Sequence, residues 1–251
     1  MFHLRVVAAL IMTVTCVGPA IAQEEDFESI VKEAFAASRA GKYDDAIRLA
    51  TKAIAIEPDN DRLYQFRGEL NFKGGHFKDS VKDFDKYLAA NPKEVPHHWQ
   101  RGLSHYYAGM YKEGVAQFEV HRTVNPEDVE NSVWHYLCNA KIVGADKARE
   151  ALIPIKADTR RWAPAVYEMY RGKMSPEEVL KASSAGKQED GELKNNLFYA
   201  HLYIGLYFES LGKTDEAKQH ITTAHEKYPS RHYMGDVARV HADLFKKNAP
   251  E

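Results

Sequence analysis

The sequence is short of cysteine: its 251 residues include two, Cys16 and Cys138. Cys16 belongs to an N-terminal segment with the features of a signal peptide, so one thiol remains in the mature chain. A single cysteine cannot form an internal disulfide, and the folded domain must be held together by packing. Because Cys138 stands in the apolar stretch WHYLCNAK, we expect a buried, unreactive thiol.

The sequence also lacks an apolar run of the roughly 20 residues that a membrane-spanning helix needs. Its N-terminal apolar run is shorter, follows Arg5 and precedes the small residues A-I-A at positions 20–22. This order is typical of a secretory signal peptide, residues 1–22, with cleavage before Gln23. We therefore predict a periplasmic or secreted mature chain that has no transmembrane helix after cleavage.

Neither sign of charge dominates the chain. It holds 34 Lys and Arg and 36 Asp and Glu, and loss of residues 1–22, which contain one Arg and no acid, leaves 33 against 36, a net charge of −3. A nucleic-acid-binding protein would carry a basic stripe, so this class of partner is not predicted. The balanced charge likewise offers no polybasic patch for a membrane surface.

Motifs for catalysis and for metal binding are missing as well. Ser104 and His105 follow Gly102 but lack the second glycine and the preceding strand of a nucleophile elbow. Eleven of the 12 histidines lie outside residues 1–22, yet no two are three or four apart, the spacing that places two imidazoles on one helix face. We predict no enzyme activity, no cofactor and no metal site.

What the sequence does contain is a repeat of 34 residues. The stretches GKYDDAI, GHFKDSV and GMYKEGV begin at Gly41, Gly75 and Gly109. Other positions recur with the same step: Pro58, Pro92 and Pro126, and the small residues Ala46, Ser80 and Gly114. The pattern resembles the tetratricopeptide repeat, whose units are two antiparallel helices held close by small residues. A fourth copy has its glycines at Gly205 and Gly212.

Between the third and fourth copies the period is lost, but helical patterning continues. Ser175 and Pro176, followed by two acids, predict a helix start, whereas the small and polar segment 181–194 predicts an exposed connection. We expect an all-α superhelix of helix-turn-helix units. Its organisation is a signal peptide at 1–22, three repeat units at 23–126, two diverged helical pairs at 127–190, and a last unit with a capping helix at 191–251.

The resemblance also predicts a binding surface, because the first helices of such units line the concave side of the superhelix. The family's usual groove positions correspond here to Arg62, Gln65, Glu69, Phe72, Lys73, Trp99, Leu103, Tyr106 and Tyr107, with Tyr199, Leu202, Leu206, Glu209 and Ser210 in the last unit. Aromatic anchors beside charged residues suit a partner peptide. Alternatively, the middle section folds back into the groove, and Trp99, Tyr106 and Tyr107 belong to the core.

A closer resemblance lies in the order of four stretches: RGLSHYYAGMYKEG, VWHYLCNAK, RRWAPAVYEMYRGKMSPEEVL and the segment from NNLFYAHLY to VARVH. Over most of residues 60–245 this order is similar to the NlpI-type lipoproteins of the bacterial envelope. Those proteins are periplasmic scaffolds that bring peptidoglycan hydrolases to a processing protease. The resemblance implies a non-catalytic adaptor that binds other envelope proteins. Cys16 lacks the small-residue box of a lipidation site, which argues against a lipid anchor.

Two other functions stay open. Histidines from different repeats would be able to meet and assist in binding a metal ion or a small molecule. In the other, the chain is a subunit of an enzyme, and a partner protein supplies the catalytic groups. Exposed repeat ends also allow self-association into a homodimer.

Overall fold

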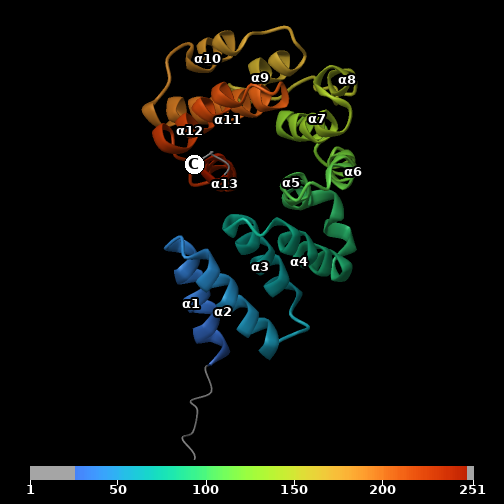
Figure 1. The fold of residues 1–251 in the computed structure, drawn as a ribbon, viewed down its shortest axis with the longest axis vertical. Coiled ribbons are helices and arrows are strands. Elements are labelled where there is room, and N and C mark those ends of the chain that lie inside the picture. Colours follow the sequence, from blue (N-terminus) through green and yellow to red (C-terminus); the bar gives the residue numbers. More distant parts are fainter. Residues whose placement is uncertain (1–25, 248–251) are drawn as a thin grey trace, which may run out of the picture.

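The computed structural model of the chain describes residues 26–247, which form helices and turns without a β-strand. The predicted all-α fold is confirmed for this part of the chain. The predicted signal peptide, residues 1–22, lies outside the described residues, and so does Cys16. Figure 1 shows helices that follow one another along an arc, as in a solenoid.

The helical segments are short and are joined mostly by tight turns. In chain order they are α1 (Phe27–Arg39), α2 (Tyr43–Ile56), α3 (Asp61–Gly74), α4 (Phe77–Ala90), η1 (Pro92–His97), α5 (Trp99–Tyr107), α6 (Tyr111–His121), α7 (Val129–Val143), α8 (Ala145–Glu150), α9 (Ala163–Tyr170), α10 (Pro176–Ser184), α11 (Asp190–Ser210), α12 (Thr214–Lys227) and α13 (Tyr233–Lys247). The segment η1 is a 3-10 helix. Neighbouring helices pack as pairs, α1 with α2, α3 with α4, α5 with α6 and α11 with α12.

The path of the chain brings its last helix back to its early repeats. In Figure 1 helices α1 to α4 form the lower part of the molecule, α5 to α8 climb along one side, and α9 to α12 close over the top. Helix α13 then lies inside the arc, where it packs against α12 and reaches α3. The concave side of the solenoid is therefore partly occupied by a helix of the same chain.

The turn inside each repeat is closed by a glycine. Gly75 follows α3 in the left-handed conformation, with a φ of 83°. The N–H of His76 donates to the carbonyl of Asn71 and the N–H of Gly75 to that of Phe72, which satisfies the last carbonyls of the helix. The other glycines at this repeat position have φ values of 73° to 76°: Gly41, Gly109 and Gly212. The predicted role of the repeated glycine is confirmed.

A second glycine position lets the two helices of a pair approach closely. A Cβ atom on Gly102 of α5 would lie 2.6 Å from the ring of Phe118 on α6. In the last unit, a Cβ atom on Gly205 of α11 would lie 2.7 Å from Ile221 on α12. Protein side chains do not pack at such distances, so these two positions require glycine. The predicted close packing is confirmed.

The helix start predicted at Ser175 is confirmed by a capping box. The N–H of Glu178 donates to Ser175 Oγ over 3.2 Å, and the N–H of Ser175 donates to the Glu178 carboxylate over 2.7 Å. These reciprocal bonds satisfy backbone donors that the first turn of a helix leaves free. They fix the first residue of α10.

The exposed connection predicted at residues 181–194 is wrong at both ends. Helix α10 continues to Ser184, and α11 begins at Asp190. Between them the side chain of Gln188 donates to the carbonyl of Ser183, at the end of α10. The small, polar composition predicted a loop, but both helices extend into the segment.

The main hydrophobic core extends from Phe72, at the end of α3, to α13, and the first repeats have two small cores of their own. Trp134 and Trp162, 2% and 1% exposed, are its largest side chains. Cys138 is buried there as a free thiol, as predicted, and burial raises its pKa above the ordinary value. None of the helices between residues 26 and 247 has the length and apolarity needed to cross a membrane.

Candidate functional site

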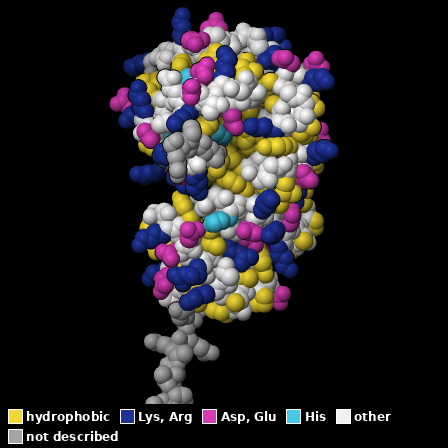
Figure 2. All heavy atoms as spheres, in the orientation of Figure 1, with side chains coloured by type: hydrophobic (Ala, Val, Ile, Leu, Met, Phe, Trp, Pro, Cys, Tyr) yellow, Lys and Arg dark blue, Asp and Glu magenta, His cyan; other side chains and the backbone are white. Residues whose placement is uncertain are grey.

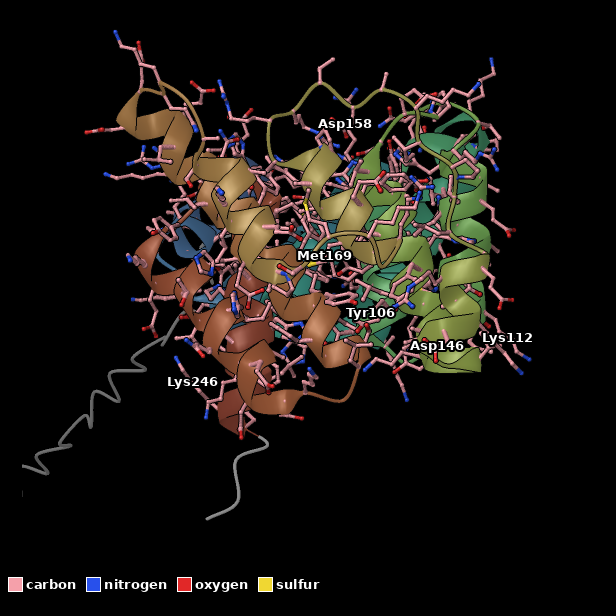
Figure 3. The ribbon with its side chains drawn as sticks, turned by 90° about the horizontal axis from the view of Figure 1, so that it is seen from above. Tyr106, Lys112, Asp146, Asp158, Met169 and Lys246 are labelled. Carbon is pink, nitrogen blue, oxygen red and sulfur yellow. The ribbon has the colours of Figure 1, made fainter. Side chains whose placement is uncertain are left out.

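The predicted groove residues divide into a buried group and an accessible group. Phe72, Leu103 and Tyr106 are 0%, 1% and 5% exposed and belong to the main core, as do Leu202 and Leu206 of the last unit, so these five do not offer a free surface to a partner. In Figure 3 Tyr106 lies in the interior of the molecule, whereas Lys112 lies at its edge. The accessible group consists of exposed Arg62 and of partly buried Gln65, Glu69, Lys73, Trp99 and Tyr107.

Helix α13 covers this part of the groove, and Trp134 of the middle section packs against Tyr106 and Tyr107. Tyr233 at its start stacks on Phe72 with 5.3 Å between ring centroids and meets Trp99 edge to face at 5.0 Å. One turn further, Asp236 forms an ion pair of 3.2 Å with Lys73. The concave surface thus holds a helix through both aromatic and charged contacts.

The second half of α13 is fixed by a hydrogen-bonded chain. Tyr107 and His241 share a hydrogen bond of 2.9 Å, and the His241 ring lies 3.1 Å from the Glu209 carboxylate. Lys141 donates to the same carboxylate over 3.0 Å. Burial disfavours the charge of Glu209, but His241 and Lys141 outweigh burial and hold its pKa at about 2. Glu209, which the sequence places in the groove of the last unit, therefore serves to anchor α13.

The contacts of α13 with α3 lie at Phe72 and Lys73, and the N-terminal end of α3 lies outside them. Arg62 is exposed there. The side-chain N–H of Gln65 donates to the Glu69 carboxylate over 3.0 Å, and its Oε1 accepts a hydrogen bond of 2.7 Å from His98 Nε2. Burial raises the pKa of Glu69 above its ordinary value. Figure 2 shows hydrophobic side chains gathered along the hollow between the lower and upper parts of the molecule.

A cavity of about 610 Å³, which we call the central cavity, lies beside this surface. It is bounded by η1, α5, α6, α7, α11 and the start of α13. Its lining consists of His97, Trp99, Leu103, Phe118, His121, Val124, Asn125, Asp128, Glu130, Asn131, Trp134, Tyr199, His232, Tyr233 and Met234. Of the predicted groove residues it contains three: Trp99, Leu103 and Tyr199.

One wall of the central cavity belongs to a cluster of three carboxylates around one guanidinium. Arg160 forms ion pairs with Asp128, Glu130 and Asp158. Asp128 also caps α7 by accepting from the N–H of Glu130 over 3.0 Å. With all three acids ionised the cluster has a net charge of −2. It forms because residues 151–162 pass back over the start of α7, which the sequence pattern does not indicate.

Within this cluster Glu130 has the most perturbed carboxyl group. Burial raises its pKa to about 7, although Arg160 and the hydroxyl of Tyr203 favour the charged form. The folded state thus binds a proton more tightly than the unfolded chain does. The proton's contribution to the free energy of unfolding is fully present below about pH 4.5, the ordinary pKa of a glutamate side chain. It is lost as the pH rises through 7.

Replacement of Glu130 by glutamine is expected to remove this loss, because the amide has the size of the carboxyl group and no charge. Urea unfolding at pH 8 should give the variant a free energy of unfolding up to about 3 kcal/mol above that of the unsubstituted protein. At pH 4.5 the two proteins should be nearly equal. An unchanged pH dependence in the variant would show that Glu130 is ionised at no such cost.

Three side chains of the cavity lining carry polar atoms that no group in the described chain hydrogen-bonds. They are Asn131 Oδ1, Trp134 Nε1 and Tyr233 Oη. Asn131 and Trp134 are 3% and 2% exposed, and such buried polar atoms normally have partners. The lining therefore has an unused acceptor, an unused donor and an unused hydroxyl group.

A second cavity adjoins the central one and shares Tyr199 and His232 with it. Arg160, Arg161 and Trp162 form one side of it, and Trp162 stacks on Tyr199 with 4.6 Å between centroids. Its arginines are already paired, Arg160 with the three acids and Arg161 with Glu192 over 3.2 Å. This cavity thus has no free cation of its own.

Ser104 and His105, the residues that partly match a nucleophile elbow, do not form a reactive site. Ser104 and His105 lie inside α5 and are buried. Ser104 Oγ shares a hydrogen bond of 2.9 Å with Ser80 and donates to the carbonyl of Gln100. Across residues 26–247 no group of three or more His, Cys, Asp or Glu side chains is placed to hold a metal ion.

Comparison with known proteins matches two parts of the chain to one family. Models described as "Tetratricopeptide repeat" match residues 37–100 and residues 199–230. A crystal structure of a tetratricopeptide repeat protein from Parabacteroides merdae ATCC 43184 is similar in fold, with a TM-score of 0.52. The two chains are 16% identical, and the likeness covers 90% of this chain and 86% of that one.

Proposed function

Because this chain carries tetratricopeptide repeats at residues 37–100 and 199–230, we propose that it is a non-catalytic scaffold that binds other proteins. The observation that carries the proposal is the docking of α13 in the concave groove. There the surface already accommodates a polypeptide helix, through the ring of Tyr233 and the carboxylate of Asp236. A partner segment would use the same kinds of contact at the N-terminal end of α3.

The partner surface that we propose begins at Arg62 and includes Gln65 and Glu69. Arg62 is exposed, and its guanidinium makes no ion pair within the described chain. Gln65 and Glu69 lie one and two turns further along the same helix face. An exposed cation beside a partly buried carboxyl group favours a polar partner segment that carries at least one acidic side chain.

We place this scaffold in the bacterial cell envelope. The support comes from the signal-peptide pattern of residues 1–22 and from the similarity to NlpI-type lipoproteins, both of them features of the sequence. By that resemblance the partners are a peptidoglycan hydrolase and a protease, and the chain acts as the adaptor between them. N-terminal sequencing of the protein from cells tests the export step, and a mature chain that starts at Gln23 is the expected result.

Charge reversal at Arg62 should weaken partner binding without affecting the fold. We expect Arg62→Glu to reduce the recovery of crosslinked envelope partners about tenfold, because it replaces an attractive charge by a repulsive one at the N-terminal end of α3. The measurement is crosslinking in the native envelope, affinity purification and quantitative mass spectrometry.

The matched control is Lys112→Glu, the same change of charge on an exposed residue at the edge of the molecule (Figure 3). The control should retain its partners, and both variants should unfold at the temperature of the unsubstituted chain. If Arg62→Glu keeps the full set of partners, the partner surface is not at this end of α3. If purified protein alone turns over a substrate, the scaffold proposal fails.

A further inference from the structure

The central cavity is a candidate for a second binding site that does not depend on the partner surface at Arg62. Its lining contains two carboxylates, Asp128 and Glu130, and no lysine or arginine. The two side chains keep 16% and 17% of their area exposed. Arg160, the cation that pairs with both, lies outside the lining and is shared with Asp158. An anionic ligand would therefore meet repulsion here, and a cation would meet attraction.

The remaining wall of the cavity is aromatic. Trp99, Trp134, Tyr199 and Tyr233 all contribute to the lining. Aromatic faces attract organic cations through their quadrupole, most strongly where the site is desolvated. The rings also offer apolar area to the hydrocarbon part of a ligand. An inorganic ion would use neither property, and the described residues offer it no set of three ligands.

Polar atoms without a partner complete the lining. The amide of Asn131 is oriented by its Nδ2, which donates to the carbonyl of Phe118 over 3.1 Å and leaves Oδ1 as a free acceptor. Trp134 lies three residues further along α7, on the same helix face, and its Nε1 is a free donor. A ligand that satisfies both atoms needs a donor group and an acceptor oxygen.

We propose that the central cavity binds an organic ammonium ion that also carries a neutral oxygen acceptor. The ammonium group donates to Asn131 Oδ1 and lies near the carboxylates of Asp128 and Glu130. The oxygen accepts from Trp134 Nε1, and the hydrocarbon part of the ligand packs on Trp99 and Tyr199. Two kinds of ligand carry this pair of groups. One is a free amino alcohol, and the other is a lysine in a polypeptide, which supplies its side-chain ammonium group and a backbone amide.

Titration with matched pairs of small probes tests the proposal on the intact mature chain. The first pair is 6-aminohexan-1-ol and hexane-1,6-diol, which differ in one ammonium group. The second pair is N-acetyl-lysine methylamide and N-acetyl-norleucine methylamide, which differ in the same group. The chain has three tryptophans, so with ¹⁵N-labelled tryptophan the indole N–H signals report the site, and the signals of Trp134 and Trp99 should shift.

The expected result is that each ammonium probe binds at least about tenfold tighter than its neutral partner. Glu130→Gln and Asp128→Asn should each weaken the ammonium probe severalfold and leave the neutral probe unchanged. Asn at position 128 keeps an oxygen that caps α7. Glu113→Gln, the same change on an exposed residue of α6 outside the cavity lining, should have no effect.

Several results would overturn the proposal. One is equal affinity for the ammonium and neutral probes, and another is tighter binding of an anionic probe, N-acetyl-glutamate methylamide. A third is ammonium binding that persists unchanged in both carboxyl variants, because the charge would then act elsewhere. If the lysine derivative binds more tightly than the amino alcohol, the natural ligand is a polypeptide, and the reverse order indicates a small molecule. Neither order affects the test at Arg62.

Discussion

Replacing Phe72 with alanine is expected to lower the free energy of unfolding by about 4 kcal/mol, the typical cost of removing a buried phenylalanine ring. Phe72 is fully buried at the end of α3. Its ring contacts Phe77, Tyr107 and Tyr233, with centroid distances of 5.7, 5.5 and 5.3 Å. The substitution therefore removes the ring on which α13 docks as well as part of the core between α3 and α5.

Urea unfolding measures the total loss, and hydrogen exchange locates it. Amides of α13 should lose more protection than amides of α1, because α13 depends on the missing ring and α1 does not. The matched control is Phe35→Ala, the same substitution at a side chain that is 46% exposed and stacks on Phe66. There the loss should be about 1 kcal/mol. Equal losses at the two positions would mean that α13 is not held by Phe72.

Substitution of Arg160 by methionine is expected to cost about 3 kcal/mol at pH 8. Removal of one partner from a buried ion pair typically costs about 3–5 kcal/mol, because the other charge is left without compensation. The lower end applies because the Arg160 side chain is itself 38% exposed and partly screened. Three carboxylates, on Asp128, Glu130 and Asp158, would then face one another without their cation.

The loss should be smaller at pH 5 than at pH 8, since Glu130, with a pKa of about 7, is protonated at the lower pH. Arg161→Met is the control, because the adjacent residue forms one pair with Glu192 in which both side chains are well exposed, 40% and 47%. Exposed pairs of this kind contribute about 0.5 kcal/mol. A loss at Arg160 no greater than that at Arg161 would show that the cluster is fully hydrated and does not require its cation.

The features predicted well from the sequence are those set by short-range rules. Gly75 ends a helix because its backbone must turn left-handed, and Gly102 recurs because a neighbouring ring leaves no room for a Cβ atom. Both requirements act at fixed offsets within one repeat. The capping box at Ser175 is equally local. Such features can be predicted from spacing alone.

Divergence of the sequence hid one further copy of the same turn. Gly172 follows α9 with a φ of 74°, and the N–H of Lys173 donates to the carbonyl of Glu168, the arrangement found after α3. The aromatic residue and the proline of the repeat do not accompany this glycine at their usual offsets. A search for the period therefore passes over it. The signal that remains is a single glycine after an aromatic helix.

The position of α13 lay beyond the reach of sequence patterns. Its apolar spacing predicted a helix after Pro229, and that helix is present. Its docking depends on contacts such as the bond from Arg239 to the carbonyl of Lys73, between residues 166 apart in the chain. No periodicity within either segment encodes that pairing. For this reason the sequence does not decide between an open groove and a filled one.

Sequence patterns do not reveal the central cavity, for a related reason. Acids at the start of a helix, such as Asp128 and Glu130, are sufficiently explained by the helix dipole and by capping. In the folded chain, residues 151–162 bring one arginine, Arg160, to these two acids. The excess of negative charge at this place follows from that fold and not from the local sequence. Asn131 and Trp134 read as ordinary core positions of an amphipathic helix. That partner binding occurs at the accessible groove residues, Arg62 first among them, stays a prediction.

The return of α13 to α3 also has a mechanical consequence. A solenoid with free ends can lengthen like a spring, because each repeat touches its immediate neighbours alone. Here the ion pair between Asp236 and Lys73 and the stacking of Tyr233 on Phe72 join the last helix to the second repeat. A force that pulls the first and last helices apart would have to break these two contacts before it could stretch the arc. The curvature of the solenoid is therefore fixed for as long as these contacts hold.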